Sequence, residues 1–237
     1  MPVVTLHQTA PAEPLHSQLM QLVVDNFSDL SATALPPSNP LYNLYQYALG
    51  FEVHLYLQAL GGTRLPVGLV LACEEEQLAG FVLYLPIDAE EGACAIAYMA
   101  VRQDLRRRGI ARAMLAEVRR RHPRMELACG KGKVACFEAL GFEVVGARGP
   151  QVLMATDAPA ADAELAVLDV APIFRTVEIQ QIHSYLLKQH GRKAMVEAEK
   201  KRDRHLDELT RHAAAFAWER TQRWQIRPTR IVQERRP

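Results

Sequence analysis

A group of arginines around a glycine is the part of this sequence best suited to chemistry. Arg106, Arg107 and Arg108 stand directly before Gly109, in a turn that follows the apolar segment 93–101 and precedes a helical pattern. Amides at the start of a helix lack partners within it and carry partial positive charge, and a glycine lets a ligand approach the backbone closely. We therefore expect this turn to bind a pyrophosphate, through its amides and its arginine side chains.

Two other phosphate-binding motifs are missing from the sequence. It contains neither Gly-x-x-x-x-Gly-Lys-Ser/Thr nor Gly-x-Gly-x-x-Gly. The turn is therefore neither the phosphate loop of nucleoside triphosphatases nor the dinucleotide-binding fingerprint.

The elements that position this turn are predicted from the spacing of apolar residues and from turn signals. In chain order they are a strand over 3–6, helices over 15–30 and 41–60, antiparallel strands over 66–73, 78–87 and 93–101, an amphipathic helix over 109–121, a strand over 125–129, a helix over 133–140, and closing strands over 142–145 and 151–155. We expect an α/β protein with a mixed central sheet of six to seven strands flanked by helices.

Two motifs of the sequence resemble those of a known family. Arg106-x-x-Gly109-x-Ala111 fits the Arg/Gln-x-x-Gly-x-Gly/Ala signature of the GNAT superfamily of N-acetyltransferases, and Phe137-Glu-Ala-Leu-Gly141-Phe142 is similar to the family's Tyr-x-x-x-Gly-Phe element. The order of the predicted elements also fits. The resemblance implies a GNAT fold and an acyl-CoA-binding domain over residues 1–157. It also implies an N-acetyltransferase that moves an acetyl group from acetyl-CoA to a primary amine by direct attack in a ternary complex.

The cofactor implied by the resemblance is acetyl-CoA or another acyl-CoA. Its pantetheine arm is expected to pair with the backbone of Met99 and Val101. It would enter between the segments 93–101 and 125–129, which splay apart in the family. The implied cofactor-binding residues are Met99, Val101, Arg106, Arg107, Arg108, Gly109, Ile110, Ala111, Arg112 and Phe137.

Two catalytic groups that are common in the family are replaced in this chain. Ala95 occupies the position of a general-base glutamate, and Phe137 that of a tyrosine that protonates the departing thiolate. The remaining candidates for catalysis are Tyr98, Tyr84, Cys129 and His54, although each also fits a packed or surface role. Glu52 stands close to His54 on the predicted aromatic helix.

These replacements leave two hypotheses open. The first is an active acyltransferase of the GNAT type. The second is a catalytically weak or inactive acyl-CoA-binding protein with a regulatory or interaction role, which would work through its helical extension. Turnover, rather than binding, separates the two.

The acceptor is inferred from an uneven distribution of charge. Residues 1–100 have a net charge of −9, whereas residues 101–157 have a net charge of +6. The helix over 41–60 is expected to cover the acceptor pocket, and it carries five aromatic rings but no Lys or Arg. Such rings suit packing in a core equally well. Aromatic faces in a negative region also suit a cation, so the expected acceptor is an amine-bearing small molecule, a protein lysine or a protein N-terminus.

Residues 158–237 lie outside the resemblance and form a predicted helical extension. We expect a linker over 155–166, a helix over 172–190 ended by Gly191, a long helix to about Trp224, and a loose tail. The extension would pack on the first domain, form a homodimer or bind a partner. The apolar residues proposed for these contacts are Phe174, Ile179, Ile182, Leu186, Leu206, Leu209, Ala213 and Phe216. Interleaved acidic residues argue against nucleic-acid binding.

The cysteines and the hydropathy of the chain point to the cytoplasm. Four cysteines lie in or beside apolar segments without the close spacing of metal ligands, so we expect reduced thiols and no metal site. No uncharged apolar run reaches the roughly 18 residues that a membrane-spanning helix needs. The first 24 residues contain no Lys or Arg, so no secretory signal peptide is expected.

Overall fold

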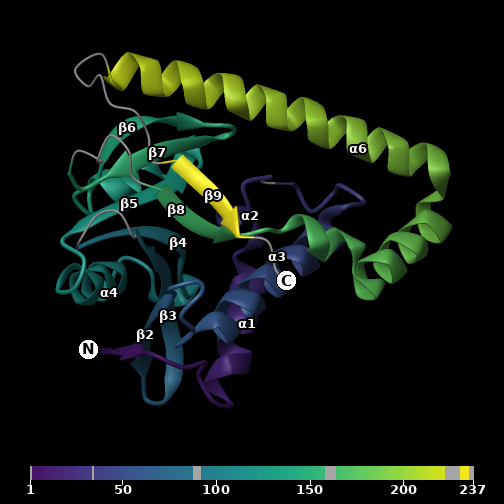
Figure 1. Ribbon diagram of the computed structural model, residues 1–237. Helices are drawn as coiled ribbons and strands as arrows, with labels where there is room; N and C mark the ends of the chain where they lie inside the picture. The colour runs from purple at the N-terminus through teal and green to yellow at the C-terminus, as the bar shows by residue number, and fades with distance from the viewer. Residues whose placement is uncertain (1, 34, 88–91, 158–163, 222–229, 235–237) are drawn as a thin grey trace.

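The computed structural model describes residues 2–33, 35–87, 92–157, 164–221 and 230–234 (Figure 1). Its main sheet has seven strands in the order β1-β2-β3-β4-β5-β7-β6. They are β1 Val3–His7, β2 Gly68–Glu74, β3 Gln77–Pro86, β4 Ala93–Val101, β5 Arg124–Cys129, β6 Glu143–Arg148 and β7 Gln151–Ala155. Only the β4–β5 pair is parallel among these neighbours. This confirms the mixed sheet predicted from the sequence.

Helices cover both faces of the sheet. The main ones are α1 Leu15–Asp25, α2 Phe27–Leu30, α3 Tyr42–Ala59, α4 Ile110–Arg119 and α5 Val134–Glu138, with short 3-10 turns η1 Gln103–Leu105 and η2 Lys131–Lys133. Leu69, Leu71 and Leu83 pack in the core beneath α1 and α3. Val70 and Val82 pack in a second core beneath α4. Because both faces are buried, β2 and β3 are nearly continuous apolar runs.

One predicted helix is divided in two. The apolar spacing over residues 15–30 predicted a single helix, but α1 ends at Asp25 and α2 begins at Phe27. Asn26 lies between them with non-helical backbone angles, and its buried side chain donates a hydrogen bond to the carbonyl of Leu22 at 2.8 Å. The side chain therefore competes locally with the backbone for the helical acceptor.

The C-terminal extension differs from its sequence prediction. Residues 164–168 form strand β8 (Glu164–Leu168), which pairs in parallel with β9 (Arg230–Glu234), so neither an unstructured linker nor a loose tail describes these segments. The expectations for residues 158–163 and for a helix end near Trp224 lie outside the described residues. The turn η3 Ala171–Arg175 and the long helix α6 Val177–Thr221 follow β8, and Gly191 interrupts α6 with a φ of 78°.

The extension packs on the rest of the chain. Ile179 and Leu186 are buried in the α1–α3 core, and Phe174 and Ile182 pack against it. The C-terminal part of α6 runs over β6 and β7, where Ala213 is buried in the α4 core (Figure 1). Of the alternatives considered for these apolar residues, the structure supports packing on the first domain. No helix among the described residues is both long and apolar enough to cross a membrane.

Candidate functional site

The arginine-rich turn joins the end of β4 to the start of α4. Arg107 has a φ of 66° and Gly109 a φ of 80°, and Gly109 is the residue before the first turn of α4. The first amide of this region to bond back into the helix is that of Ala113, which donates to the carbonyl of Gly109 at 3.0 Å. The amides of 109–112 therefore have no acceptor within α4.

The space beside the Cα of Gly109 is open enough for a ligand to approach. A Cβ built on this glycine would meet no atom within 4 Å, so the backbone is open on that side. The turn thus combines amides without an acceptor in α4, left-handed backbone and free space. These are the properties that a diphosphate group requires of a helix N-terminus.

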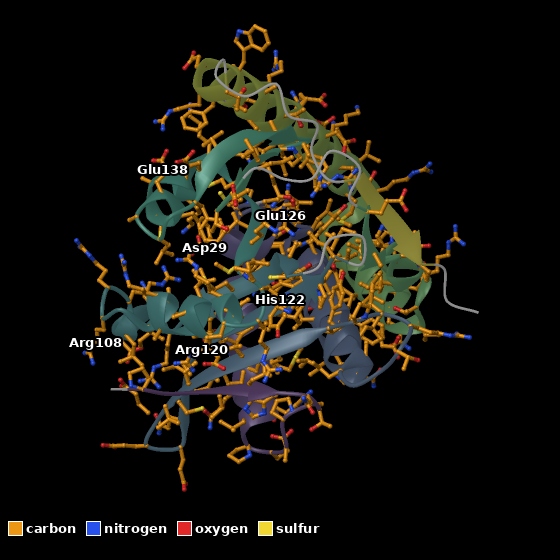
Figure 2. All side chains as sticks on the ribbon, turned by 60° about the vertical axis from the view of Figure 1, so that its left-hand side comes forward. Asp29, Arg108, Arg120, His122, Glu126 and Glu138 are labelled. Atoms are coloured by element: carbon orange, nitrogen blue, oxygen red, sulfur yellow. The ribbon has the colours of Figure 1, made fainter. Side chains whose placement is uncertain are left out.

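The arginine side chains of the turn do not all face the same way. Arg106 lies against the end of β4 and against α2: it donates to the carbonyl of Val101 at 3.2 Å and to the side chain of Asn26, and pairs with Asp29 at 3.3 Å. Lys133 also pairs with Asp29, at 2.7 Å. Arg108, in contrast, projects outward at the edge of the molecule (Figure 2).

Strands β4 and β5 pair along only the first part of their length. Their pairing runs from Ala93 opposite Arg124 to Ile96 opposite Leu127, although β4 continues to Val101. This is the splayed pair that the resemblance implied. An opening between two strands leaves backbone groups unpaired, so it can accept an extended ligand as an added strand.

A bulge changes which side chains of β4 face α3. In the β3–β4 ladder, Leu83 pairs with Tyr98 and Tyr84 pairs with Ile96, so Ala97 has no partner across the ladder. The extra residue reverses the alternation of the strand. As a result Ala95 and Tyr98 both pack on the α3 side of the sheet.

A cavity of about 580 Å³ opens at the bulge, between the sheet and α3. Its walls include α3, the parts of β4 and β5 where their pairing ends, and the extension. The polar and aromatic side chains that line it include Tyr45, Glu52, Tyr56, Tyr98, Glu126, Arg148 and Phe174. The extension was not predicted to reach this site, because no local pattern in residues 164–174 indicates which surface they cover.

Glu52 and Tyr98 lie side by side in the lining of this cavity and influence each other's pKa. Burial raises the pKa of Glu52, while the hydrogen bond from Tyr98 works in the opposite direction. Burial raises the pKa of Tyr98 well above its ordinary value, and the neighbouring Glu52 raises it further. The ring of Tyr56 lies 6.3 Å from that of Tyr98, and its pKa is likewise raised by burial. Burial therefore favours the neutral forms of both the carboxyl and the phenols at this cavity.

A second carboxylate lies next to the position that Ala95 occupies. Glu126 is the register partner of Ala95 on β5, and both line the cavity. Arg148 lies at the cavity too, where desolvation lowers its pKa and the charge of Glu126 raises it. Sequence analysis did not single out Glu126; its signal was a charged residue between apolar neighbours on a predicted buried strand.

Three of the four sequence-predicted catalytic candidates lie away from the cavity lining. Tyr84 packs in the α4 core, with its ring 5.2 Å from that of His122. His54 lies 3.0 Å from the side chain of Gln58 and packs edge-on to His16. Cys129 is buried in the α4 core, where burial raises the pKa of its thiol to about 12. The structure thus brings only Tyr98 of these four to the cavity.

The remaining predicted cofactor residues surround the turn and the opening. Met99 and Val101 lie on the part of β4 that extends beyond the pairing with β5. Arg112 donates to the carbonyl of Ala139 at 2.9 Å, which links the start of α4 to the end of α5. Phe137 packs edge-on against Phe142, with ring centroids 5.9 Å apart.

Comparison with known proteins bears on the fold. Residues 41–142 match the family model described as the acetyltransferase (GNAT) family. The structure is similar to that of PaiA N-acetyltransferase from Thermoplasma acidophilum in complex with coenzyme A, with a TM-score of 0.52 and 11% identity over 65% of this chain and 99% of that chain.

Two further solved structures have lower TM-scores. One is a histone acetyltransferase HPA2 and related acetyltransferase from Corynebacterium glutamicum, with a TM-score of 0.49 and 16% identity over 67% of this chain and 97% of that chain. The other is an acetyltransferase of the GNAT family from Desulfovibrio desulfuricans, with a TM-score of 0.46 and 18% identity over 65% of this chain and 98% of that chain. No curated protein matches the sequence.

Proposed function

Since residues 41–142 carry a GNAT acetyltransferase domain and the chain has the GNAT fold, we propose that it transfers an acetyl group from acetyl-CoA to the nitrogen of a primary amine. The observation that carries the proposal is the position of the Glu52–Tyr98 pair. It lies at the cavity where the pairing of β4 with β5 ends, and β4 continues from there to the turn with open backbone at Gly109.

The chain offers a continuous set of residues for holding acetyl-CoA. The amides at 107–112 would hold the diphosphate, and the free edge of β4 at Met99 and Val101 would pair with the pantetheine arm. The acetyl group would then lie near the bulge at Ala97. When bound, acetyl-CoA supplies a thioester that an amine can attack. Four free thiols in the chain are compatible with the reducing cytoplasm, which we propose as its location.

Glu52 is the proposed general base. An amine is mostly protonated at neutral pH and must lose a proton before it attacks. Burial raises the pKa of Glu52, which makes its carboxylate a stronger base than an exposed one. Its Oε atoms would accept the ammonium proton directly or through one water. In this proposal, a residue on α3 performs the role that the family resemblance gives to a glutamate at position 95.

Tyr98 is the proposed partner of Glu52 and the candidate proton donor. Its hydroxyl donates to Glu52 and stays protonated at neutral pH, because burial and the adjacent carboxylate both raise its pKa. A backbone group released by the bulge at Ala97 would stabilise negative charge on the carbonyl oxygen. Cys129 has no part in the proposal, because its thiol is buried in the other core.

The proposal is tested by turnover of the full-length protein. Acetyl-CoA is incubated with a panel of primary amines, and release of free CoA is followed together with the mass of the product. We expect CoA release that depends on the amine and that falls strongly in Glu52→Gln. CoA binding without turnover of any amine would overturn the proposal and leave an acyl-CoA-binding protein instead.

A further inference from the structure

The C-terminal extension supplies one wall of the cavity. Leu165, Val167 and Leu168 of β8 line it, and so do Ile173 and Phe174 of η3. These residues lie outside the segment 41–142 that matches the GNAT family model. The wall is thus a feature of this chain that the match to the domain does not supply.

The wall is tied to α3 by specific contacts. The amide of Leu168 donates to the hydroxyl of Tyr56 at 3.3 Å. The ring of Phe174 lies 5.6 Å from that of Tyr45. Arg202 of α6 donates to the hydroxyl of Tyr45 at 2.6 Å and lies 5.8 Å from the centre of its ring. The extension therefore fixes the position of two aromatic rings of the cavity as well as adding its own.

The side chains that line the cavity favour an organic cation as its ligand. The extension holds the hydroxyls of Tyr45 and Tyr56, and Phe174 adds a third ring to the lining, so the cavity presents aromatic surface in a fixed arrangement. Arg148 and Glu126 offset one another, because the carboxylate raises the pKa of the guanidinium. Glu52 lies beside the neutral hydroxyls of Tyr98 and Tyr56. A carboxylate among aromatic faces attracts an ammonium group on an apolar body.

The size of the cavity limits what can enter it. About 580 Å³ lies within the range of small-molecule pockets, and the end of the acyl carrier must share it with the acceptor. From these observations we infer that the extension restricts the acceptor to a small organic amine with an apolar or aromatic body, in preference to a lysine on a protein surface. This inference rests on the proposed function and narrows its substrate class.

The test compares two substitutions of the same type in the same extension. Phe174→Ala removes a wall residue. Phe216→Ala removes a half-buried ring of α6 that packs against Lys131 and Arg220, with centroid distances of 5.2 Å and 5.0 Å, and that does not line the cavity. The probes are phenethylamine, spermidine, and a lysine-containing peptide. Binding of each probe to the protein is measured by calorimetry, and acetylation is measured separately.

We expect Phe174→Ala to weaken phenethylamine binding about tenfold, through the loss of one aromatic contact and the widening of the cavity. Binding of the two larger probes should fall less or improve. Phe216→Ala should leave all three affinities within about twofold, which is below half a kcal/mol. Val167→Trp provides a second variant, because it fills the cavity instead of emptying it and should exclude all three probes.

The outcomes separate this inference from the proposed function. If amines are acetylated but Phe174→Ala and Val167→Trp behave like Phe216→Ala, the wall has no effect on the acceptor and the inference is wrong. Preferred acetylation of the lysine peptide by the unaltered protein would also overturn it. If phenethylamine binds in a Phe174-dependent manner but is never acetylated, the inference stands and the proposed function fails. If no probe binds, the inference fails.

Discussion

At the scale of single residues, the proposed activity depends on a carboxylate that the fold partly desolvates. Glu52 lies on α3 beside the hydroxyl of Tyr98, and burial raises the pKa of its carboxyl. The strand position that would carry a glutamate by resemblance holds Ala95, with Glu126 as its register partner. The cavity that Ala95 lines is therefore also lined by two carboxylates, one from a helix and one from the adjacent strand.

Replacement of Glu52 by glutamine should lower activity without lowering stability at neutral pH. A general base contributes about 10²- to 10⁴-fold, so kcat should fall within that range. A carboxyl whose pKa is raised by folding stabilises the fold below its unfolded pKa of about 4.3, and this contribution is lost as pH rises through the folded value. A glutamine side chain does not ionise, so Glu52→Gln avoids the cost of a desolvated charge at pH 7. The Tm of this variant at pH 7 should therefore equal or exceed that of the unaltered protein.

Thermal melts from pH 4 to 8 and the pH profile of kcat/KM measure these two effects. Glu219→Gln, an exposed carboxyl on α6, serves as the matched control and should change neither. Full activity in Glu52→Gln would move the role of base to Glu126 or to water.

Gly109 is the second residue whose properties decide the site. It has a φ of 80° and open space around its missing Cβ, and Gly191 in the kink of α6 shares both properties, with a φ of 78°. Alanine should cost each site about 1–2 kcal/mol of folding free energy, because left-handed backbone is unfavourable for residues with a Cβ.

Only the change at Gly109 should reduce CoA affinity, by at least about tenfold, because its methyl group would occupy the space where the diphosphate approaches. Calorimetric titration of CoA into Gly109→Ala and Gly191→Ala makes the comparison. Equal losses of affinity in both variants would mean that the turn does not contact the ligand.

At the scale of elements, a single aspartate joins three segments around the phosphate turn. Asp29 of α2 pairs with Arg106 at 3.3 Å and with Lys133 of η2 at 2.7 Å. Arg106 follows β4 and Lys133 follows β5, so the carboxylate links the segments that leave the two separated strands. An anion arriving at the turn would meet cations that already have a carboxylate partner.

Asp29→Asn should therefore tighten CoA binding. Release of two half-exposed cations is worth about a two- to fivefold gain in affinity, and added salt should reduce the gain. Asp25→Asn is the control, because Asp25 accepts a hydrogen bond from the neutral side chain of Gln21. Weaker CoA binding in Asp29→Asn would show instead that the aspartate positions Arg106 and Lys133 for the ligand.

Some of the elements around the site could be predicted from the sequence, and others could not. The succession of strand, basic turn and helix around Gly109 was predictable, because amphipathic spacing, a glycine and the arginines all act within a few residues. The bulge at Ala97 was not, since it depends on the register with β3. The pairing of β8 with β9 joins short segments about sixty residues apart, and no local pattern identifies such partners.

At the scale of the whole molecule, α6 connects both cores. Near its kink, Met195 and Ala198 are buried in the α1–α3 core, and the side chain of Asn39 donates to the carbonyl of Ala198 at 3.4 Å. Farther along, Ala213 and Ala217 are buried in the α4 core (Figure 1). Because β8 and η3 belong to the same extension, we expect the docking of α6 to help hold the wall of the cavity in place.

Ala213→Asp should test this role of α6. Ala213 is only 1% exposed, so a carboxylate there would lose its hydration without gaining a partner, and the free energy of unfolding should fall by about 2–4 kcal/mol. Its neighbour Ala214 is exposed, and Ala214→Asp should change stability by less than about 0.5 kcal/mol.

Urea unfolding gives the free energies of both variants, and calorimetry with phenethylamine reports on the cavity wall. If α6 holds the wall in place, Ala213→Asp should weaken amine binding under conditions where the protein remains folded, whereas Ala214→Asp should not. Loss of stability with unchanged amine affinity would show that β8 and η3 keep their position without α6, through their own contacts with Tyr45 and Tyr56.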